Sequence, residues 1–206
     1  MSNIRGILLA AGYSRRFGAN KLLAPLPPGH AEAGVPIAIA AARRLAAALP
    51  EPVAVTRPRS QKIARMLRES GCRTVTCRNA ADGMGTSLAA GVRACEDADG
   101  WVIALADMPF IRAETVARIA RALEEGAAIA APAWRGERGH PVGFARRFRD
   151  DLLALSGDEG ARGILMQHPD WITVLDVDDP GVVRDVDTPV DLERAAGSHP
   201  APERRS

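Results

Sequence analysis

The feature that most constrains this chain is a short apolar run near its start that ends in small residues. Residues 4–9 read IRGILL, and residues 10–12 read AAG. A run this short cannot make a useful helix, so it predicts a buried strand. The small residues after it let a ligand approach the main chain, where backbone N–H groups can bind an anion. The sequence therefore predicts a strand that opens into an anion-binding loop.

Positive charge follows these small residues. Arg15, Arg16 and Lys21 come after the loop begins, with Gly18 between them. Of the 27 cationic side chains only two are lysines, Lys21 and Lys62, and the rest are arginines. A compact ammonium can bind a phosphate in a way that the wide guanidinium fork cannot. Lys21 is therefore a candidate phosphate ligand, and the plain alternative is an ordinary solvated cation in a loop.

The spacing of the glycines argues against two common phosphate loops. Five residues separate Gly12 from Gly18, and Lys21 comes three residues after the second glycine. A P-loop of Walker type has four residues between its glycines and a lysine directly after the second. The segment does not read G-x-G-x-x-G either, so an NAD-dependent reductase lacks its main sequence support.

Length and composition predict one globular domain. A chain of 206 residues can build one sizeable core, and we expect a single domain over 1–196 with a disordered polar tail over 197–206. With 47% hydrophobic residues and a formal charge of +2, the composition shows no basic excess that would predict nucleic-acid binding. No apolar run approaches the ~20 residues of a membrane span, and the N-terminus does not resemble a signal peptide. We therefore expect a cytoplasmic protein that binds no membrane.

The three cysteines predict neither disulfides nor a zinc site. Cys72, Cys77 and Cys95 are odd in number and show neither C-x-x-C nor histidine spacing. We expect them to be small core or strand residues.

Strand and helix patterns alternate along the chain, with short connections between them. The patterns predict strands at 53–56, 74–76, 101–106, 129–132, 171–177 and 182–186, and helices at 37–49, 61–69, 112–125 and from 189. Such alternation predicts an α/β fold in three layers, with a mostly parallel sheet and helices on both faces. In these sheets ligands gather at the carboxyl ends of the strands.

Two later segments could bring polar groups to that edge. A glycine-rich turn at 79–85 leads into a helix, with Gly83 and Ser87 near its start, and a helix start can bind a phosphate or a base. An ordinary capped helix explains this segment equally well. Asp107 follows the most apolar strand, where a carboxylate could hold Mg²⁺ against substrate phosphates. Its alternative role is to cap the turn before the next helix.

A second carboxylate comes from the end of the chain. Thr188 reads as a helix N-cap with Asp191 as its capping-box partner, so Asp191 has a sufficient structural role. Asp187 has no such role and is the candidate second metal ligand. We expect Asp185 to point to the other face of the sheet.

These segments together resemble the nucleotidyltransferases that act on molybdopterin. The matching positions are Leu9-Ala10-Ala11-Gly12, Ser14, Arg16-Phe17-Gly18, Lys21, Gly83-Met84, Ser87-Leu88, Gly91-Val92, Asp107-Met108-Pro109, Gly139-His140-Pro141, the GDEGAR run at 157–162 and the DVDTPVDL run at 185–192. The resemblance covers 4–195. It departs from the family at Asn79, which Ala80 follows where the family has proline, with one residue fewer before Gly83.

The resemblance implies a fold like that of the nucleotide-diphospho-sugar transferases and a set of site residues. It implies Mg²⁺ on Asp107 and Asp187, catalytic roles for Lys21, Arg15, Arg16 and Asp107, and second-substrate contacts at His140 and Arg162. It implies nucleotide contacts at Leu9, Ala10, Ala11, Gly12, Gly18, Lys21, Gly83, Ser87 and Asp107. From the residues alone, His140 could equally be structural, and Arg162 could pair with a surface carboxylate.

The activity that the resemblance implies is transfer of a nucleotide monophosphate to the terminal phosphate of molybdopterin or its molybdenum form, with release of pyrophosphate. Ala11 and Phe17 resemble the cytidylyl-transferring branch, which favours CTP over GTP. The resemblance also implies a molybdoenzyme of the xanthine-oxidase type, or its chaperone, as a partner. The alternatives are a guanylyltransferase, a sugar- or isoprenoid-phosphate nucleotidyltransferase, and a nucleotide-binding escort of the cofactor without turnover.

Overall fold

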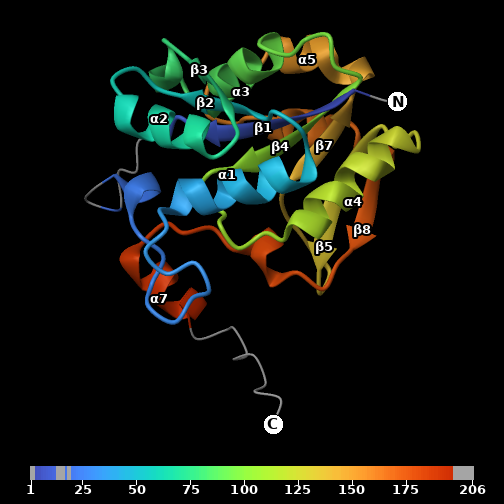
Figure 1. Cartoon of the computed structure of the whole chain (residues 1–206). Helices are drawn as coiled ribbons and strands as arrows, with labels where there is room; N and C mark the ends of the chain where they lie inside the picture. The colour runs from blue at the N-terminus through green and yellow to red at the C-terminus, as the bar shows by residue number, and fades with distance from the viewer. Residues whose placement is uncertain (1–2, 13–16, 18–19, 197–206) are drawn as a thin grey trace.

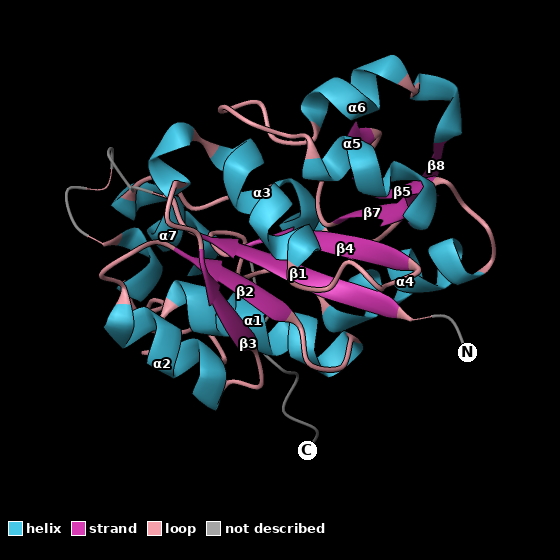
Figure 2. Cartoon of the chain, turned by 90° about the horizontal axis from the view of Figure 1, so that it is seen from above, coloured by secondary structure: helices cyan, strands magenta, loops and turns pink. Residues whose placement is uncertain are grey.

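The computed structural model describes residues 3–12, 17 and 20–196. The expected disordered tail at 197–206 lies outside these residues. The strands are β1 (Ile4–Ala10), β2 (Val53–Thr56), β3 (Arg73–Thr76), β4 (Gly100–Leu105), β5 (Ile129–Trp134), β6 (Glu137–Arg138), β7 (Val142–Ala145) and β8 (Ile172–Asp176). They form one sheet in the order β3-β2-β1-β4-β7-β5-β6, with β8 beside β5, and Figure 2 shows this sheet from above.

The first four strands of the chain run parallel, as the alternation predicts. β1 pairs in parallel with both β2 and β4, and β2 pairs in parallel with β3. Their carboxyl ends therefore share one edge of the sheet. β7 lies antiparallel between β4 and β5, so β5 runs in the same direction as β4 and ends at the same edge. The sequence analysis did not predict β6 or β7, because two- and four-residue strands next to glycine and proline carry little periodicity.

Helices cover both faces of the sheet, which confirms the predicted three-layer α/β class. The helices are α1 (Ile37–Ala48), α2 (Gln61–Glu69), α3 (Met84–Arg93), α4 (Ala113–Glu124), α5 (Arg149–Leu153), α6 (Arg162–Gln167) and α7 (Pro189–Ala196). In Figure 1, α3 and α5 lie above the sheet and α1 and α4 lie below it. Among the helices in the part of the chain that the structure describes, none has the length and apolarity that crossing a membrane requires.

Alternating side chains along the strands build two cores, one on each face. In β1, Leu8 packs into the core under α1 and α4, while its neighbour Ile7 packs into the core under α3 and α5. Val102 and Ile103 of β4 divide between the same two cores. This alternation follows from the period of two along a strand, and burial on both faces explains why these strands read as continuous apolar runs.

The cysteines are small buried residues, as expected. Cys72, Cys77 and Cys95 are free and buried. Burial raises the pKa of the Cys72 and Cys95 thiols to about 11. The Cys95 carbonyl also accepts a hydrogen bond of 3.1 Å from the buried indole of Trp101.

Residues 179–187, called here the closing segment, cross the carboxyl edge of the sheet without joining it. The strand predicted at 182–186 is wrong, because Pro180–Val183 forms a 3-10 turn instead. Its apolar residues are nevertheless core residues, and Val182 and Val186 are fully buried. The peptide N–H of His140 donates to the Val182 carbonyl at 2.8 Å. The segment therefore reads as apolar because it is buried, not because it pairs with a strand.

Asp179 fixes the start of the closing segment. Its carboxylate is 2% exposed and accepts hydrogen bonds from the N–H of Arg112, the hydroxyl of Thr115 and the N–H of Gly181. A side chain built on Gly181 would meet the Phe110 carbonyl oxygen at 2.3 Å, so the chain passes very close to the start of α4. One buried carboxylate thus joins α4 to the closing segment.

We expect Asp179→Ala to lower the free energy of unfolding by about 3 kcal/mol, because it leaves buried donors without an acceptor. Urea denaturation followed by circular dichroism measures the change. Asp178→Ala is the matched control, because Asp178 is the adjacent aspartate in the sequence and is exposed. Equal stabilities of the two variants would contradict the role given to Asp179.

Candidate active site

Three charged side chains from distant parts of the sequence meet at the carboxyl edge of the sheet. The Lys21 ammonium donates to Asp107 Oδ2 at 2.9 Å and to Asp187 Oδ1 at 2.8 Å. Lys21 is 7% exposed, whereas the side chains of Asp107 and Asp187 are 26% and 40% exposed. The structure thus brings together the candidate phosphate ligand and both candidate metal ligands.

The end of β4 positions Asp107. The N–H of Ala106 donates to the Leu9 carbonyl of β1 at 3.1 Å, which extends the parallel pairing beyond the strand. The chain then turns, and the N–H of Met108 donates to the Leu105 carbonyl at 3.2 Å. Asp107 therefore leaves the sheet beside the loop that follows β1.

Two local interactions position Asp187. The N–H of Val186 donates to the Asp107 carbonyl at 2.9 Å, which places the end of the closing segment on the end of β4. Beyond it, Asp191 Oδ2 accepts hydrogen bonds from the N–H and the hydroxyl of Thr188, and the Asp191 N–H donates to the Thr188 hydroxyl. The predicted capping box at the start of α7 is confirmed. It holds the backbone of Asp187 as well, because Asp187 N–H donates to the same carboxylate at 3.2 Å.

The two carboxylates keep Lys21 charged. Burial alone lowers the pKa of Lys21, but the hydrogen bonds and charges of Asp187 and Asp107 outweigh it, and the pKa is raised above its ordinary value. A lysine with a raised pKa stabilises the fold at every pH below its unfolded pKa, and the contribution is lost as the pH rises through the folded pKa. At neutral pH the site therefore holds a full ammonium.

Asp185 lies close to this group, which corrects the expectation that it points away. Partial burial, followed by the negative charges of Asp187 and Asp107, raises the pKa of Asp185. The expectation assumed a strand that the chain does not form. It also failed because residues two apart along an extended chain share a face.

A cavity of about 460 Å³ opens next to the charged group, between the strand ends and α3. Most of the residues predicted to contact a nucleotide line it: Leu9, Ala11, Gly12, Gly83, Ser87 and Asp107. Its other lining residues are Ala80, Ala81, Met84, Leu105 and Asp158; the sequence analysis gave none of them a nucleotide contact, although Met84 and Asp158 lie in segments that resemble the family. A side chain built on Gly12 would meet nothing within 4 Å, so the space beside this glycine is open to a ligand.

The start of α3 is packed differently from the expectation. The N–H of Gly85 donates to the Gly157 carbonyl at 2.8 Å, so this N–H binds the protein rather than a phosphate. Gly83 has φ +120°, and a side chain there would lie 2.2 Å from the Gly157 carbonyl oxygen. Gly83 is therefore required for the close approach of Gly157 and Asp158, and Asp158 lines one wall of the cavity. The GDEGAR run in the sequence was the available signal for this wall.

His140 lies behind Asp107 at the start of β7. Burial lowers the pKa of His140, and the negative charge of Asp107 offsets only part of the effect, so the imidazole is neutral near pH 7. Its Nδ1 is buried and, among the described residues, has no hydrogen-bond partner. A hydrogen bond with the Ile103 backbone and the nearby charge of Asp107 place His140 beside the end of β4.

The remaining predicted residues are placed as follows. Ala10 is buried at the end of β1, and Arg162 is exposed at the first position of α6 and does not line the cavity. Arg15, Arg16 and Gly18 lie outside the residues that the structure describes.

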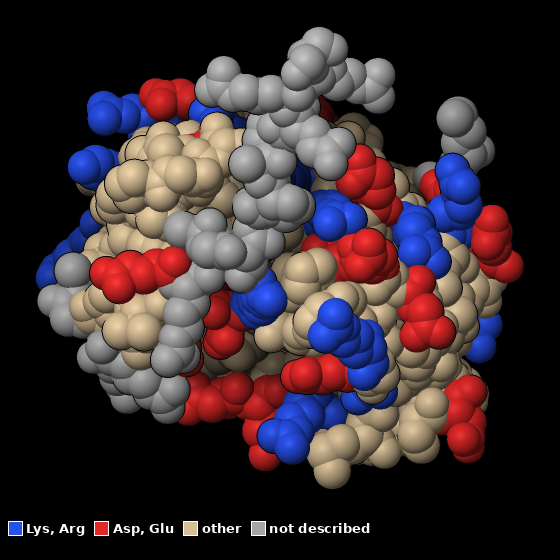
Figure 3. Space-filling model, turned by 90° about the horizontal axis from the view of Figure 1, so that it is seen from below, with Lys and Arg blue, Asp and Glu red and all other residues tan. Residues whose placement is uncertain are grey.

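On the face seen in Figure 3, acidic and basic side chains lie intermixed.

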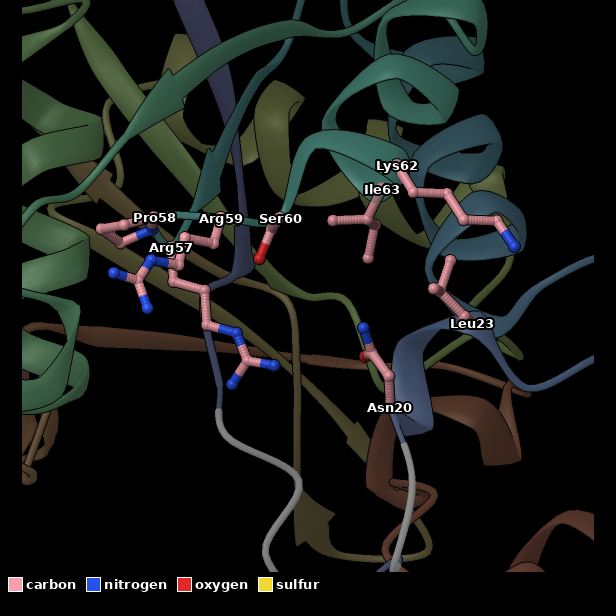
Figure 4. Close-up of a pocket in the computed structure, with 8 residues that line it drawn as sticks. All are labelled: Asn20, Leu23, Arg57, Pro58, Arg59, Ser60, Lys62 and Ile63. Carbon is pink, nitrogen blue, oxygen red and sulfur yellow. The ribbon is translucent and has the colours of Figure 1, made fainter.

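A larger hollow of about 690 Å³ lies beside Asn20 and Leu23, between the end of β2 and the start of α2. Its lining includes three cations, Arg57, Arg59 and Lys62, together with Asn20 and Ser60. Figure 4 shows that the Lys62 ammonium points away from the two guanidinium groups. These charges therefore do not converge on one ligand position.

Asp107 and Asp187 fit a divalent cation. Both carboxylates already converge on one positive centre, the Lys21 ammonium, which stands where a metal ion could bind. Within the described residues, no group of three or more histidine, cysteine, aspartate or glutamate side chains could hold a metal. Mg²⁺ typically takes one or two carboxylates and completes its shell with water and substrate phosphates, so two carboxylates are sufficient.

An α/β sheet with a lysine, two carboxylates and a cavity at its carboxyl edge defines a class of nucleotide-binding proteins. Residues 6–181 match the MobA-like NTP transferase domain, and this chain belongs to that family. The predicted family and fold class are thereby confirmed, and the chain is a member of a nucleotidyltransferase family.

The similarity to other proteins extends over nearly the whole chain. The purine catabolism protein PucB of Bacillus subtilis is 31% identical, over 91% of this chain and 93% of its own length. The nicotine blue oxidoreductase of Paenarthrobacter nicotinovorans is 29% identical, over 90% and 92%. The crystal structure of Rv0371c from Mycobacterium tuberculosis has a TM-score of 0.81 at 26% identity, over 96% of this chain and 98% of that one. A second structure of Rv0371c, with a TM-score of 0.75 at 25% identity over 96% and 100%, is a complex with manganese.

We expect Lys21→Met to lower the melting temperature without metal by about 4–8 °C, the effect of losing roughly 2 kcal/mol from a partly buried ion pair. The variant leaves two carboxylates facing each other without a counter-charge. Mn²⁺ or Mg²⁺ should then raise its melting temperature more than that of the unchanged protein, since the metal no longer competes with an ammonium. Differential scanning fluorimetry measures both shifts.

Lys62→Met is the control, because it removes the only other lysine from an exposed position. Equal metal-induced shifts in the unchanged protein and in both variants would show that the metal does not bind at Asp107 and Asp187.

Proposed function

We propose that this protein transfers CMP from CTP to the terminal phosphate of molybdopterin, or of its molybdenum form, and releases pyrophosphate. The observation that carries the proposal is the Lys21 ammonium held between Asp107 and Asp187, beside a cavity that Asp107, Ala11 and Gly12 line. One positive centre and two carboxylates suit a site that gathers phosphates and a divalent cation. We take residues 1–196 as one domain that performs this reaction.

The chemistry needs no general base from the protein. A phosphate monoester has a second pKa near ~6, so the attacking phosphate is already largely ionised at neutral pH. An oxygen of that phosphate attacks the α-phosphorus of CTP, a new P–O bond forms, and the bond to the β-phosphate breaks as pyrophosphate leaves. The protein has to hold two anions in line and neutralise the charge that moves onto the leaving group.

The residues at the carboxyl edge supply these functions. Lys21 turns from its carboxylate partners toward the phosphates, assisted by Arg15, Arg16 and the backbone amides of the loop. Asp107 and Asp187 hold Mg²⁺, which when bound supplies positive charge against the phosphate oxygens. The manganese complex of Rv0371c supports a divalent metal in this family.

The choice of nucleotide and recipient rests on resemblance. Ala11 and Phe17 match the cytidylyl-transferring branch, so we propose CTP rather than GTP. PucB is named a purine catabolism protein, which supports a recipient molybdoenzyme of the xanthine-oxidase class. His140 and Arg162 are proposed contacts of the molybdopterin side, at the positions where the sequence matches the family.

Two other functions have support to be weighed. The relative named nicotine blue oxidoreductase favours a reductase, but the loop after β1 does not read G-x-G-x-x-G. An escort that binds nucleotide and molybdopterin without turnover would need no metal-binding pair. The convergence of Lys21, Asp107 and Asp187 on one point favours the transferase over both.

The experiment is an assay of pyrophosphate release with molybdopterin, Mg²⁺ and CTP, GTP, ATP or UTP in turn, with analysis of the product by mass spectrometry. We expect release with CTP, and a loss of about 10²-fold or more in Asp107→Asn and Asp187→Asn, because the charge that holds the cation and leaving group is removed. Asp176→Asn, an exposed carboxylate at the end of β8, serves as the control.

Each other outcome points to a different function. Release of pyrophosphate with GTP alone would show that the base is guanine rather than cytosine, and it would still support a nucleotidyltransferase. Nucleotide binding without pyrophosphate release would favour the escort. Reduction of nicotine blue by a reduced nicotinamide cofactor, with no nucleotide transfer, would favour the reductase.

A further inference from the structure

One wall of the cavity carries a carboxylate, that of Asp158, which the proposed chemistry does not use. Asp158 lines the cavity and is exposed. It comes from a connection between α5 and α6, far in sequence from the loop that follows β1. We therefore asked which part of a nucleotide a carboxylate at this position could contact.

The position of Asp158 is fixed by backbone contacts. The Gly157 carbonyl accepts from Gly85 N–H at 2.8 Å, and the Asp158 nitrogen lies 2.6 Å from where a side chain on Gly83 would begin. Two glycines of α3 and its N-cap thus let this wall approach the helix. The carboxylate belongs to the α3 side of the cavity, whereas Asp107 belongs to the strand side.

Charge divides the cavity into two ends. Phosphates belong with the Lys21 ammonium and the cation held by Asp107 and Asp187. Asp107 and Asp187 share Lys21 as a counter-charge, whereas Asp158 makes no ion pair with Lys21 among the described residues, so we place the phosphates at the Lys21 end and away from Asp158. The lining residues that lead into and begin α3, Ala80, Ala81 and Met84, are small or apolar and suit the flat face of a base.

We propose that Asp158 accepts a hydrogen bond from the exocyclic amine of the nucleotide base and so selects an aminopyrimidine. This inference rests on the proposed function and deepens it. An ionised carboxylate only accepts hydrogen bonds, and the 4-amino group of cytosine only donates them. Ser87, which is 4% exposed and lines the same cavity, can donate its hydroxyl to the neighbouring ring nitrogen.

Uracil presents the opposite pattern of hydrogen-bond donors and acceptors to Asp158 and Ser87. Its 4-oxo group is an acceptor, and facing the Asp158 carboxylate it would leave two acceptors together without a proton between them. Because Asp158 is exposed, water can still reach its carboxylate, so the expected discrimination is about tenfold rather than the much larger factor of a fully buried group. Asp158 is thus a specificity-determining residue, distinct from the groups that hold the phosphates.

The test measures the binding of CTP and UTP, each with Mg²⁺, by isothermal titration calorimetry. The unchanged protein should bind CTP more tightly than UTP, and Asp158→Asn should reduce the ratio of the two dissociation constants by about tenfold, since the asparagine amide can also donate to a 4-oxo group. The ratio is the readout because removal of a negative charge raises the affinity for every triphosphate alike. Glu159→Gln, the neighbouring exposed carboxylate that does not line the cavity, should leave the ratio unchanged.

The other outcomes overturn the proposal in distinguishable ways. An unchanged ratio in Asp158→Asn, in a protein that still transfers CMP, removes Asp158 from base recognition and leaves the proposed function intact. If the effect of Asp158→Asn on CTP binding disappears with 2′-deoxy-CTP, the carboxylate binds the ribose instead. If the unchanged protein transfers no nucleotide and binds neither CTP nor UTP, the proposed function and this inference fail together.

Discussion

The interaction on which the site depends is the pair of ion contacts that Lys21 makes with Asp107 and Asp187. Each partner comes from a different element: the turn after the first loop, the end of the central strand β4, and the closing segment before α7. The positive charge of the ammonium offsets the repulsion between the two carboxylates. Without ligand, the ammonium serves as their counter-ion, so the carboxylates are already gathered when a metal and phosphates arrive.

The parts of this arrangement that sequence could predict are local. β1, β2 and β4 are buried on both faces and appear as apolar runs, and the parallel order of such runs brings their carboxyl ends to one edge. Asp107 was identifiable because it follows a strand directly. Thr188 and Asp191 were identifiable because a capping box is a contact between near neighbours.

The parts that sequence could not predict depend on contacts between distant residues. Asp185 was misplaced because the apolar pattern of the closing segment reflects burial under the loops of β4 and β7 rather than strand pairing. The contact of Gly157 with the start of α3 joins residues more than seventy positions apart, and neither segment alone indicates it. β7 was missed because an antiparallel strand inserted between β4 and β5 is a property of the sheet and not of its own four residues.

The closing segment has a consequence for the order in which the molecule matures during synthesis. Every strand of the sheet, from β1 to β8, ends by Asp176, so the sheet can assemble on a ribosome before residues 179–187 have emerged. Until then Lys21 has one carboxylate partner, and the closing segment supplies the second. A growing chain can therefore hold every strand of its sheet and still lack the second carboxylate of its site.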